Sequence, residues 1–178
     1  GLKKAEVCAK IKHLLKSKKI SAKKVVLGLS GLHCLTRPIT LPKLPKAMQE
    51  EAVMREARRL LPVPMDQLYV SWASFPGKDE EQLNAFIIAV PRIIADELFS
   101  VLKEVGLKPV SMDIKPIALT RLAGKSTAVF VDVQPSEFDL VIMSDGVPQP
   151  VRTISFPAEQ LSVEEKIEII RSDLERTI

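Results

Sequence analysis

Two short glycine-containing segments have residue types that could act on a phosphate or an ester. Gly124-Lys125-Ser126 has the ending of a phosphate-binding loop, but such a loop needs a glycine five positions before Gly124, where Leu119 stands. Gly28-Leu29-Ser30-Gly31 has the start of a turn that presents a nucleophilic serine, but the second glycine of that turn belongs at position 32, which is leucine. Neither spacing is met, so we interpret Ser30 as an ordinary turn residue and expect no phosphate-binding loop at Gly124.

The remaining reactive side chains do not have the spacing of a metal site or a catalytic pair. His33 and Cys34 are adjacent on a predicted strand, where consecutive side chains point to opposite faces, so they cannot easily share a metal ion. Two cysteines, Cys8 and Cys34, are too few for a disulfide framework and are typical of a reducing cytoplasm. The acidic residues form no convincing pair for acid–base catalysis. We therefore predict no catalytic residues and no metal site.

The helices that would position these residues follow from apolar side chains at helical spacing. This spacing predicts helices over 2–17, 45–61 and 91–106, a short helix from Pro116 to Gly124, and a last helix after Ser162. Ser162 and Glu165 form a capping box at the start of that last helix. Its stripe predicts that four residues face inward: Val163, Ile167, Ile170 and Leu174.

Short apolar runs between the helices predict strands over 25–29, 32–41, 67–75, 83–90, 107–114, 129–133, 140–143 and 151–156. Pro38 indicates an edge strand, because proline cannot donate a hydrogen bond to a neighbouring strand. The polar segment 76–81 predicts a hairpin loop, and Asp145-Gly146 predicts a tight turn. The pattern becomes all-β near residues 124–126, which is the best candidate for a domain boundary.

Composition describes a folded chain with an uneven charge distribution. The chain has 178 residues, 46% of them hydrophobic, and contains no apolar run near the roughly 18 residues that a membrane span needs. Residues 1–24 contain nine lysines and one acidic residue, Glu6, whereas the rest of the chain is net acidic. The lysines indicate either a solvated helix face or contact with an anionic membrane or a nucleic acid. Aromatic residues make up 4% and form no base-stacking platform, so we expect no specific nucleic-acid partner.

Six stretches in a consistent order carry a resemblance to a known family. The chain resembles PilM, the actin-like protein of type IV pilus assembly, whose wider group includes FtsA and the cytoplasmic part of the type II secretion protein GspL. The resemblance covers about 25–120, and its stretches are Val25–Gly31, Arg37–Pro42, Glu56–Pro62, Ala89–Pro91, Gly106–Pro109 and Asp113–Leu119. Because the chain begins with Gly1 and ends within a charged helical pattern, we expect it to be a fragment.

The resemblance implies an α+β fold with an actin-like, FtsA/PilM-type lobe. Residues 1–31 would belong to this first lobe, and 32–106 would form an inserted subdomain with the order strand–helix–strand–strand–helix. Residues 107–124 would return to the first lobe, and 125–178 would form a β-rich, partial second lobe.

Proteins of this family hold ATP between two lobes through glycine-bearing hairpins, one of which should follow Phe130-Val131-Asp132. Of that hairpin pattern this sequence keeps Asp132 and Ser136. Gln134 carries a side chain where backbone must approach phosphate, Pro135 lacks an amide donor, and Glu137 would repel phosphate. We therefore predict that the chain binds no ATP and has no other cofactor.

The function implied by the resemblance is a non-catalytic cytoplasmic scaffold, peripheral to the inner membrane. In PilM-like proteins the cytoplasmic tail of the inner-membrane protein PilN lies in a groove between the lobe and the insert. The alternatives are a GspL-like component of type II secretion, which shares the fold, and an actin-like ATPase with a divergent nucleotide site.

Overall fold

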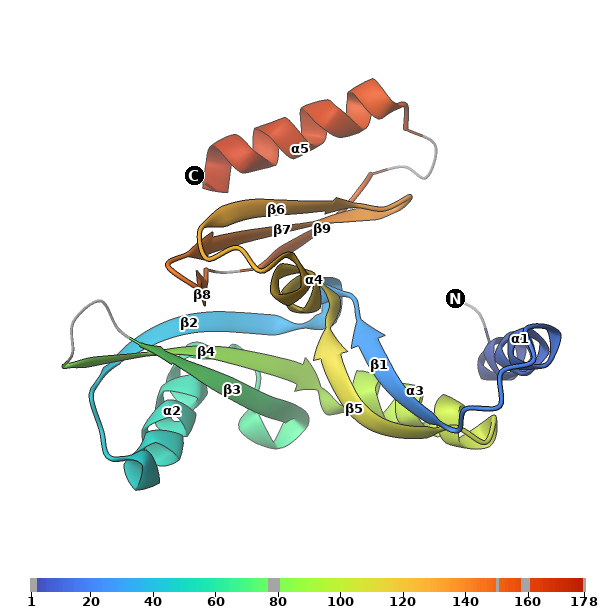
Figure 1. Ribbon diagram of the computed structural model, residues 1–178, viewed down its shortest axis with the longest axis horizontal. Coiled ribbons are helices and arrows are strands. Elements are labelled where there is room, and N and C mark those ends of the chain that lie inside the picture. Colours follow the sequence, from blue (N-terminus) through green and yellow to red (C-terminus); the bar gives the residue numbers. More distant parts are fainter. Residues whose placement is uncertain (1–2, 77–80, 150, 158–160, 178) are drawn as a thin grey trace.

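The computed structural model describes residues 3–76, 81–149, 151–157 and 161–177 (Figure 1). The helices in this part of the chain are α1 (Lys4–Ser17), α2 (Lys46–Leu60), α3 (Arg92–Glu104), α4 (Lys115–Ala123) and α5 (Val163–Thr177), with short 3-10 turns η1 (Gly31–His33) and η2 (Met65–Gln67). The strands are β1 (Lys24–Leu29), β2 (Leu35–Pro42), β3 (Leu68–Pro76), β4 (Gln82–Pro91), β5 (Lys108–Ile114), β6 (Ala128–Val133), β7 (Glu137–Ser144), β8 (Val147–Pro148) and β9 (Arg152–Ser155).

The described strands form three sheets. Sheet A pairs β1 with β5 in parallel, and sheet B is antiparallel with the order β2-β4-β3. Sheet C is built around β7, which pairs with β6, β8 and β9. In Figure 1, α2 covers the face of sheet B that is turned away from sheet C, and α5 lies beyond the outer face of sheet C. α1 lies at one end of the molecule, next to α3.

In the described part of the chain, buried apolar side chains form three clusters, and one of them joins all three sheets. The cluster between α2 and sheet B centres on Val53, Ala57 and Ile87. A second, which we call the central cluster, contains Phe86, Ile114, Ile117, Val141 and Met143. Since these residues come from β4, β5, α4 and β7, the central cluster connects sheets A, B and C through α4.

The structure confirms several helix ends, turns and edges that local sequence signals predict. Gly124 ends α4 in the left-handed conformation, with φ of 64°, which glycine adopts without a steric penalty. Asp145 and Gly146 both have positive φ, as a tight two-residue turn requires. The capping box is present, because the Ser162 N–H donates to Glu165 and the Glu165 N–H donates to the Ser162 hydroxyl. β2 is an edge strand of sheet B, in agreement with Pro38.

The predicted strand over 32–41 begins too early. Residues 31–33 form the turn η1, because the Ser30 hydroxyl accepts a hydrogen bond from the Leu32 N–H at 3.2 Å. His33 therefore lies in a turn and not on a strand, and the prediction that placed it beside Cys34 on a strand was wrong. The turn packs closely on β9 and α4, since a Cβ atom at Gly31 would collide with the Thr153 side chain and lie tightly against Pro116.

The inward face predicted for the last helix is also wrong in part. Val163 is 68% exposed and Ile167 55% exposed, whereas Ile170 and Leu174 are half-buried. An ion pair orients the helix relative to sheet C: Arg152 of β9 donates to the buried Asp173 at 2.7 Å. Asp173 therefore faces sheet C, and part of the apolar stripe faces solvent.

Three further expectations have different outcomes. The centre of the loop predicted over 76–81 lies outside the described residues. None of the described helices is both long enough and apolar enough to cross a membrane. The division of the chain at residues 31, 106 and 124 stays a prediction.

Candidate functional site

A cavity of about 230 Å³ lies beside strand β3, and we call it the β3 pocket. Strands β3 and β4 form one side, and β5 with α4 forms the other. Its lining residues are Tyr69, Val70, Ser71, Trp72, Ala73, Ile88, Val90, Met112, Asp113, Ile114 and Arg121. The pocket thus lies between segment 69–90 and segment 112–121. The family resemblance predicts that the first segment belongs to the insert and the second to the first lobe.

The alternation of side chains along β3 explains why this space is open. Leu68, Val70 and Trp72 pack with the cluster on the α2 side of sheet B. Successive side chains on a strand point to opposite faces, so Tyr69, Ser71 and Ala73 point to the other face. Ser71 and Ala73 are small, which leaves room beside Ile88 and Val90 of the neighbouring strand.

β3 also has a free edge. Within the part of the chain that the structure describes, β3 pairs with β4 and with no other strand. An edge strand presents unpaired backbone N–H and C=O groups, to which an extended segment of another protein can add. The β3 pocket therefore combines a small apolar cavity with backbone groups that can bind a peptide.

Charged and aromatic groups surround the pocket. Arg121 makes a two-pronged ion pair with Asp113, in which Nη1–Oδ2 is 2.8 Å and Nη2–Oδ1 is 3.0 Å. The Arg92 guanidinium lies over the Tyr69 ring, 4.1 Å from its centroid, and the Tyr69 hydroxyl donates to Asp96 at 2.9 Å. These contacts hold the exposed arginines in place, where they can meet the polar groups of a bound peptide.

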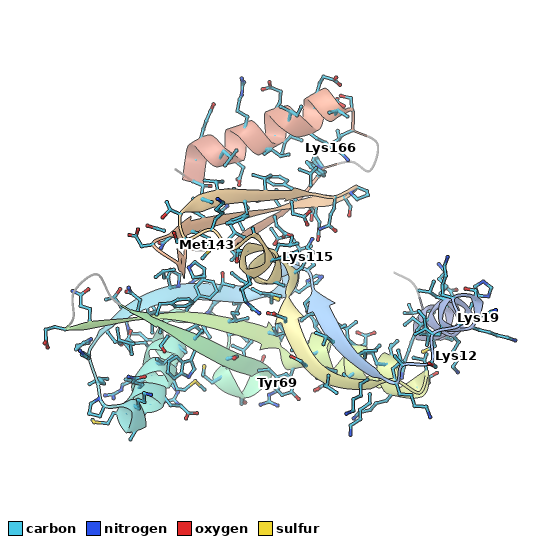
Figure 2. The ribbon with its side chains drawn as sticks, viewed as in Figure 1. Lys12, Lys19, Tyr69, Lys115, Met143 and Lys166 are labelled. Carbon is cyan, nitrogen blue, oxygen red and sulfur yellow. The ribbon has the colours of Figure 1, made fainter. Side chains whose placement is uncertain are left out.

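A second group of polar residues lies where α4 meets sheet C, and we call it the Lys115 cluster: Lys115, Asp132, Glu137 and Asp139. The Lys115 ammonium is 2.7 Å from Asp139, 3.3 Å from Asp132 and 3.6 Å from Glu137. The hydroxyl of Ser30 donates to Glu137 at 2.8 Å, and that of Thr153 donates to Asp139 at 2.5 Å. Figure 2 shows Lys115 at α4, between sheet C and the rest of the molecule.

The electrostatics of this cluster favour a charged lysine. Burial by itself would lower the pKa of Lys115, but hydrogen bonds and charge attraction from Asp139 and Asp132 together raise that pKa above the ordinary lysine value. Asp139 is 1% exposed, and its Oδ2 meets only the Lys115 ammonium among the described residues. The ammonium is thus the counter-ion of a buried carboxylate, and the cluster as a whole keeps an excess of negative charge.

The two residues predicted as remnants of a phosphate hairpin are separated in the structure. Asp132 belongs to the Lys115 cluster, whereas Ser136 is exposed outside it and its carbonyl accepts from the Phe156 N–H. Between them, the Gln134 N–H donates to the Glu137 carbonyl at 2.9 Å, so that this amide is already paired. Sequence reasoning did not find Lys115 or Asp139. The available signal was an acidic residue within an apolar strand, which indicates a buried partner.

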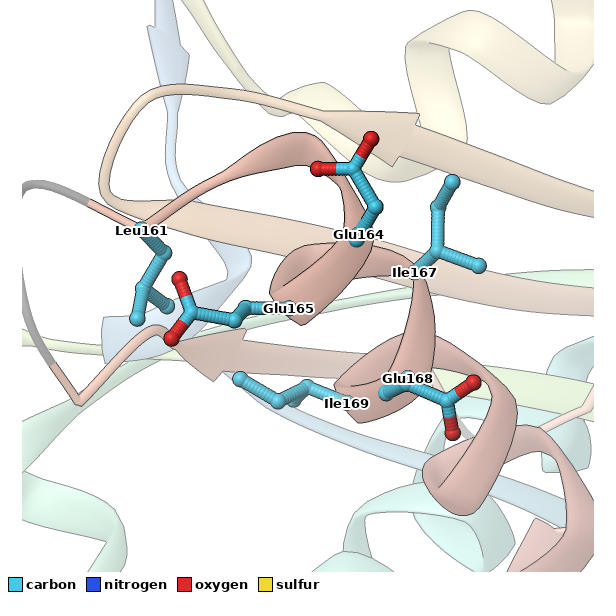
Figure 3. Close-up of a pocket in the computed structure, with 6 residues that line it drawn as sticks. All are labelled: Leu161, Glu164, Glu165, Ile167, Glu168 and Ile169. Carbon is cyan, nitrogen blue, oxygen red and sulfur yellow. The ribbon is translucent and has the colours of Figure 1, made fainter.

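A hollow along α5 is larger than the β3 pocket but is not a good ligand site. It measures about 540 Å³ and is lined by Leu161, Glu164, Glu165, Ile167, Glu168 and Ile169 (Figure 3). All of these residues come from α5 and from Leu161 just before it, so among the described residues no second element closes the space. Across the described ranges, no three His, Cys, Asp or Glu side chains are grouped to hold a metal ion.

Comparison with known proteins gives consistent results. The sequence model of the family described as type IV pilus assembly protein PilM matches residues 2–144. Among solved structures, a PilM-PilN type IV pilus biogenesis complex is similar, with 31% identity and a TM-score of 0.71 over 85% of this chain and 48% of that one. No curated protein matches the chain.

Two more distant structures are also similar. The first is the cytoplasmic domain of EpsL, an inner-membrane component of the type II secretion system of Vibrio cholerae, with 12% identity and a TM-score of 0.56 over 82% of this chain and 56% of that one. At this identity the likeness shows the fold alone. The second is a protein of unknown function with an actin-like ATPase fold from Bacteroides thetaiotaomicron, with 13% identity over 96% of this chain and 62% of that one; its TM-score of 0.45 is too low to carry an argument.

The chain spans about half the length of the PilM and EpsL structures that it matches. Over most of its own length it matches both the PilM sequence model and a PilM structure, with mixed helices and sheets in the same arrangement. The α+β, PilM-type fold expected from the sequence is therefore confirmed, and the chain belongs to the PilM family of type IV pilus assembly proteins.

Proposed function

We propose that this chain is a non-catalytic scaffold of type IV pilus assembly, which binds the cytoplasmic tail of a PilN-like inner-membrane protein in the β3 pocket. The observation that carries the proposal is the small apolar cavity beside the free edge of β3. One similar solved structure is a complex of PilM with PilN. Such docking would keep the chain in the cytoplasm, peripheral to the inner membrane.

The pocket suits an extended peptide for three physical reasons. The edge of β3 offers backbone donors and acceptors, which give affinity without regard to sequence. The space above Ser71 and Ala73 accepts an apolar side chain of the peptide, and alternate residues would point into it. The Arg121 guanidinium offers further donors, because a planar fork can bind a carboxylate or a carbonyl while it keeps its contact with Asp113.

Fluorescence anisotropy with a labelled synthetic peptide tests this docking. The peptide is the cytoplasmic tail of the PilN-like protein encoded in the same genome, titrated with the full chain. Ala73→Leu fills the cavity from a strand position that is exposed to it, and we expect at least tenfold weaker binding. Arg121→Ala should weaken binding by roughly three- to tenfold, since a hydrogen bond at an exposed site contributes about 0.7–1.4 kcal/mol.

The matched control is Arg171→Ala. Arg171 resembles Arg121 in exposure, at 65% against 62%, and also pairs with a carboxylate at 2.7 Å, but it lies on α5. Peptide binding that is unchanged in Ala73→Leu, or lost equally in Arg171→Ala, would rule out the β3 pocket as the docking site. Tighter binding of the corresponding tail from a type II secretion partner would favour the GspL-like alternative.

We also propose that the chain binds no ATP, because the residues at the expected phosphate hairpin do not fit a nucleotide. The Gln134 N–H is paired within the hairpin, and Pro135 has no N–H to offer. Glu137 and Asp139 would repel a triphosphate, and Lys115 is paired with three carboxylates. The Lys166 ammonium, which also lies at this hairpin, donates to the Pro135 carbonyl at 3.0 Å. These contacts leave few backbone donors where phosphate would have to bind, and both lysines there already have partners.

Isothermal titration with Mg-ATP measures this directly. We expect no heat of binding beyond dilution up to millimolar nucleotide. A micromolar dissociation constant would overturn the proposal and favour the divergent ATPase. Because the tail peptide and the nucleotide are titrated separately, the two proposals can fail independently.

A further inference from the structure

One end of the molecule carries a dense group of lysines that the docking of a tail does not use. We call it the lysine end: Lys10, Lys12, Lys16, Lys18, Lys19, Lys23, Lys24 and Lys108. All of these side chains are exposed. They lie on α1, in its connection to β1, and at the first residues of β1 and β5. Figure 2 shows Lys12 and Lys19 at this end, well apart from Tyr69 in the β3 pocket.

Most of these positive charges have no acidic partner among the residues that the structure describes. The ion pair at this end joins Lys4 of α1 to Glu104 of α3 at 3.0 Å, and Glu104 also attracts Lys12. Glu6 is the one acidic residue of α1. Among the residues that the structure describes, none of the eight lysines of the lysine end has a carboxylate within ion-pair distance. Lys24 and Lys108 are direct partners in the parallel ladder, and like charges side by side on paired strands repel each other.

The backbone holds these lysines in a fixed arrangement. α1 is anchored on α3 by the buried Cys8 and by a hydrogen bond from Lys4 to Ser100 at 2.8 Å. Beyond α1, the Ile20 N–H donates to the Leu15 carbonyl at 2.9 Å, and Lys19 adopts the left-handed conformation with φ of 53°. At the start of β5, the Lys108 N–H donates to the Lys23 carbonyl at 2.6 Å. The folded backbone therefore holds these like charges close to one another.

Exposed apolar side chains lie among the lysines. Leu14 is 52% exposed and Ile20 48% exposed. A surface that combines clustered lysines with a few exposed aliphatic groups fits a lipid headgroup layer, because the ammonium groups meet phosphates while the aliphatic groups enter the acyl boundary. A nucleic-acid backbone would use the lysines but would gain nothing from Leu14 and Ile20.

We propose that the lysine end binds the anionic phospholipid headgroups of a bilayer. This contact does not depend on the tail-docking site, because the lysine end and the β3 pocket share no residue. Each lysine close to an anionic surface strengthens binding by roughly fivefold at low salt. The contact would let the chain sit on the membrane beside an inner-membrane partner.

Vesicle co-sedimentation of the full chain tests the proposal. One set of vesicles contains phosphatidylglycerol mixed with phosphatidylcholine, and the other contains phosphatidylcholine alone. We expect binding to the first set at low salt, loss of that binding at high salt, and no binding to the second. The triple variant Lys18→Glu, Lys19→Glu, Lys23→Glu should bind at least a hundredfold more weakly, and Ile20→Ser should weaken binding severalfold.

The matched control makes the same change of net charge elsewhere, at the exposed Lys43→Glu, Lys46→Glu and Lys125→Glu. It should keep most of the vesicle binding. No binding of the wild-type chain at low salt, or an equal loss in both triple variants, would overturn the proposal. So would strong binding to duplex DNA without binding to phosphatidylglycerol vesicles, which would assign the surface to nucleic acid. Circular dichroism of each variant checks that the fold is retained.

Discussion

Lys115 has a structural role that its place on an ordinary helix does not suggest. Its ammonium joins α4 to sheet C by meeting Asp139, whose carboxylate is almost fully buried. A buried carboxylate without a counter-ion is strongly destabilising, and much of the cost comes from the missing partner rather than from the pair itself. Lys115 therefore compensates a charge that the fold has already buried.

Replacing Lys115 with methionine should destabilise the chain by about 2–3 kcal/mol, which is less than for a fully buried pair because the lysine is partly solvated. Urea unfolding followed by circular dichroism measures the change. Lys125→Met, which alters an exposed lysine just after α4, should change the stability by less than about 0.5 kcal/mol. Equal effects of the two substitutions would contradict the assigned role of Lys115.

The pH dependence of stability offers a separate check on the same residue. The pKa of Lys115 is raised in the folded chain, so the folded state binds its proton more tightly than the unfolded state does. The resulting stabilisation is complete below the ordinary lysine pKa of 10.5 and declines as the pH rises through the higher folded value. The difference in unfolding free energy between wild type and Lys115→Met should therefore stay constant from neutral pH to about 10 and narrow above it. A difference that narrows already near neutral pH would mean that another group is responsible.

At the scale of elements, the buried face of α5 differs from the apolar stripe that its sequence predicts. The ion pair between Arg152 and Asp173 places Asp173 toward sheet C, while Ile167 is 55% exposed and Ile170 is half-buried. Ile167→Lys should therefore change stability by less than about 0.5 kcal/mol. Ile170→Lys should cost about 1–2 kcal/mol, since it places a charge on a half-buried position. Urea unfolding of both variants tests this orientation of α5. If the whole predicted stripe faced inward, the two substitutions would lower the unfolding free energy by similar amounts.

The elements themselves could be predicted well because their signals are local. Alternating apolar residues, prolines at helix starts and glycines at helix ends act within a few residues, and they defined α2, α3, α4 and the β3–β4 hairpin closely. The turn η1 was missed because it depends on one side chain, Ser30, that binds the backbone of Leu32. The face of α5 was missed because its ion pair joins residues that are 21 positions apart.

The candidate sites could be predicted less well, because they depend on contacts between distant segments. The Lys115 cluster joins Lys115 to Asp139 and accepts a hydrogen bond from Ser30 at Glu137, and no spacing in the sequence relates these residues. The β3 pocket needs the pairing order β2-β4-β3 and the approach of β5, neither of which a single strand pattern contains. The family resemblance predicts a groove between the lobe and the insert, and the structure shows a pocket between the corresponding segments.

At the scale of the whole molecule, the central cluster decides whether the parts unfold together. Phe86 of sheet B contacts a group that includes Ile114 of sheet A and Val141 of sheet C. The Val151 N–H also donates to the Thr36 hydroxyl at 3.3 Å, which links β2 to the segment before β9. Because apolar packing is shared among all three sheets, loss of contacts in one sheet should also destabilise the other two.

Trp72 provides a test, because it is the single tryptophan of the chain and lies in sheet B, whereas Val141 lies in sheet C. Val141→Ala should cost about 2 kcal/mol and should move the urea midpoint of Trp72 fluorescence together with that of circular dichroism. Val131→Ala, at an exposed position of β6, should leave both midpoints unchanged within error. If Val141→Ala moved the circular dichroism midpoint alone, sheet C would unfold as an independent unit and the central cluster would not couple the three sheets.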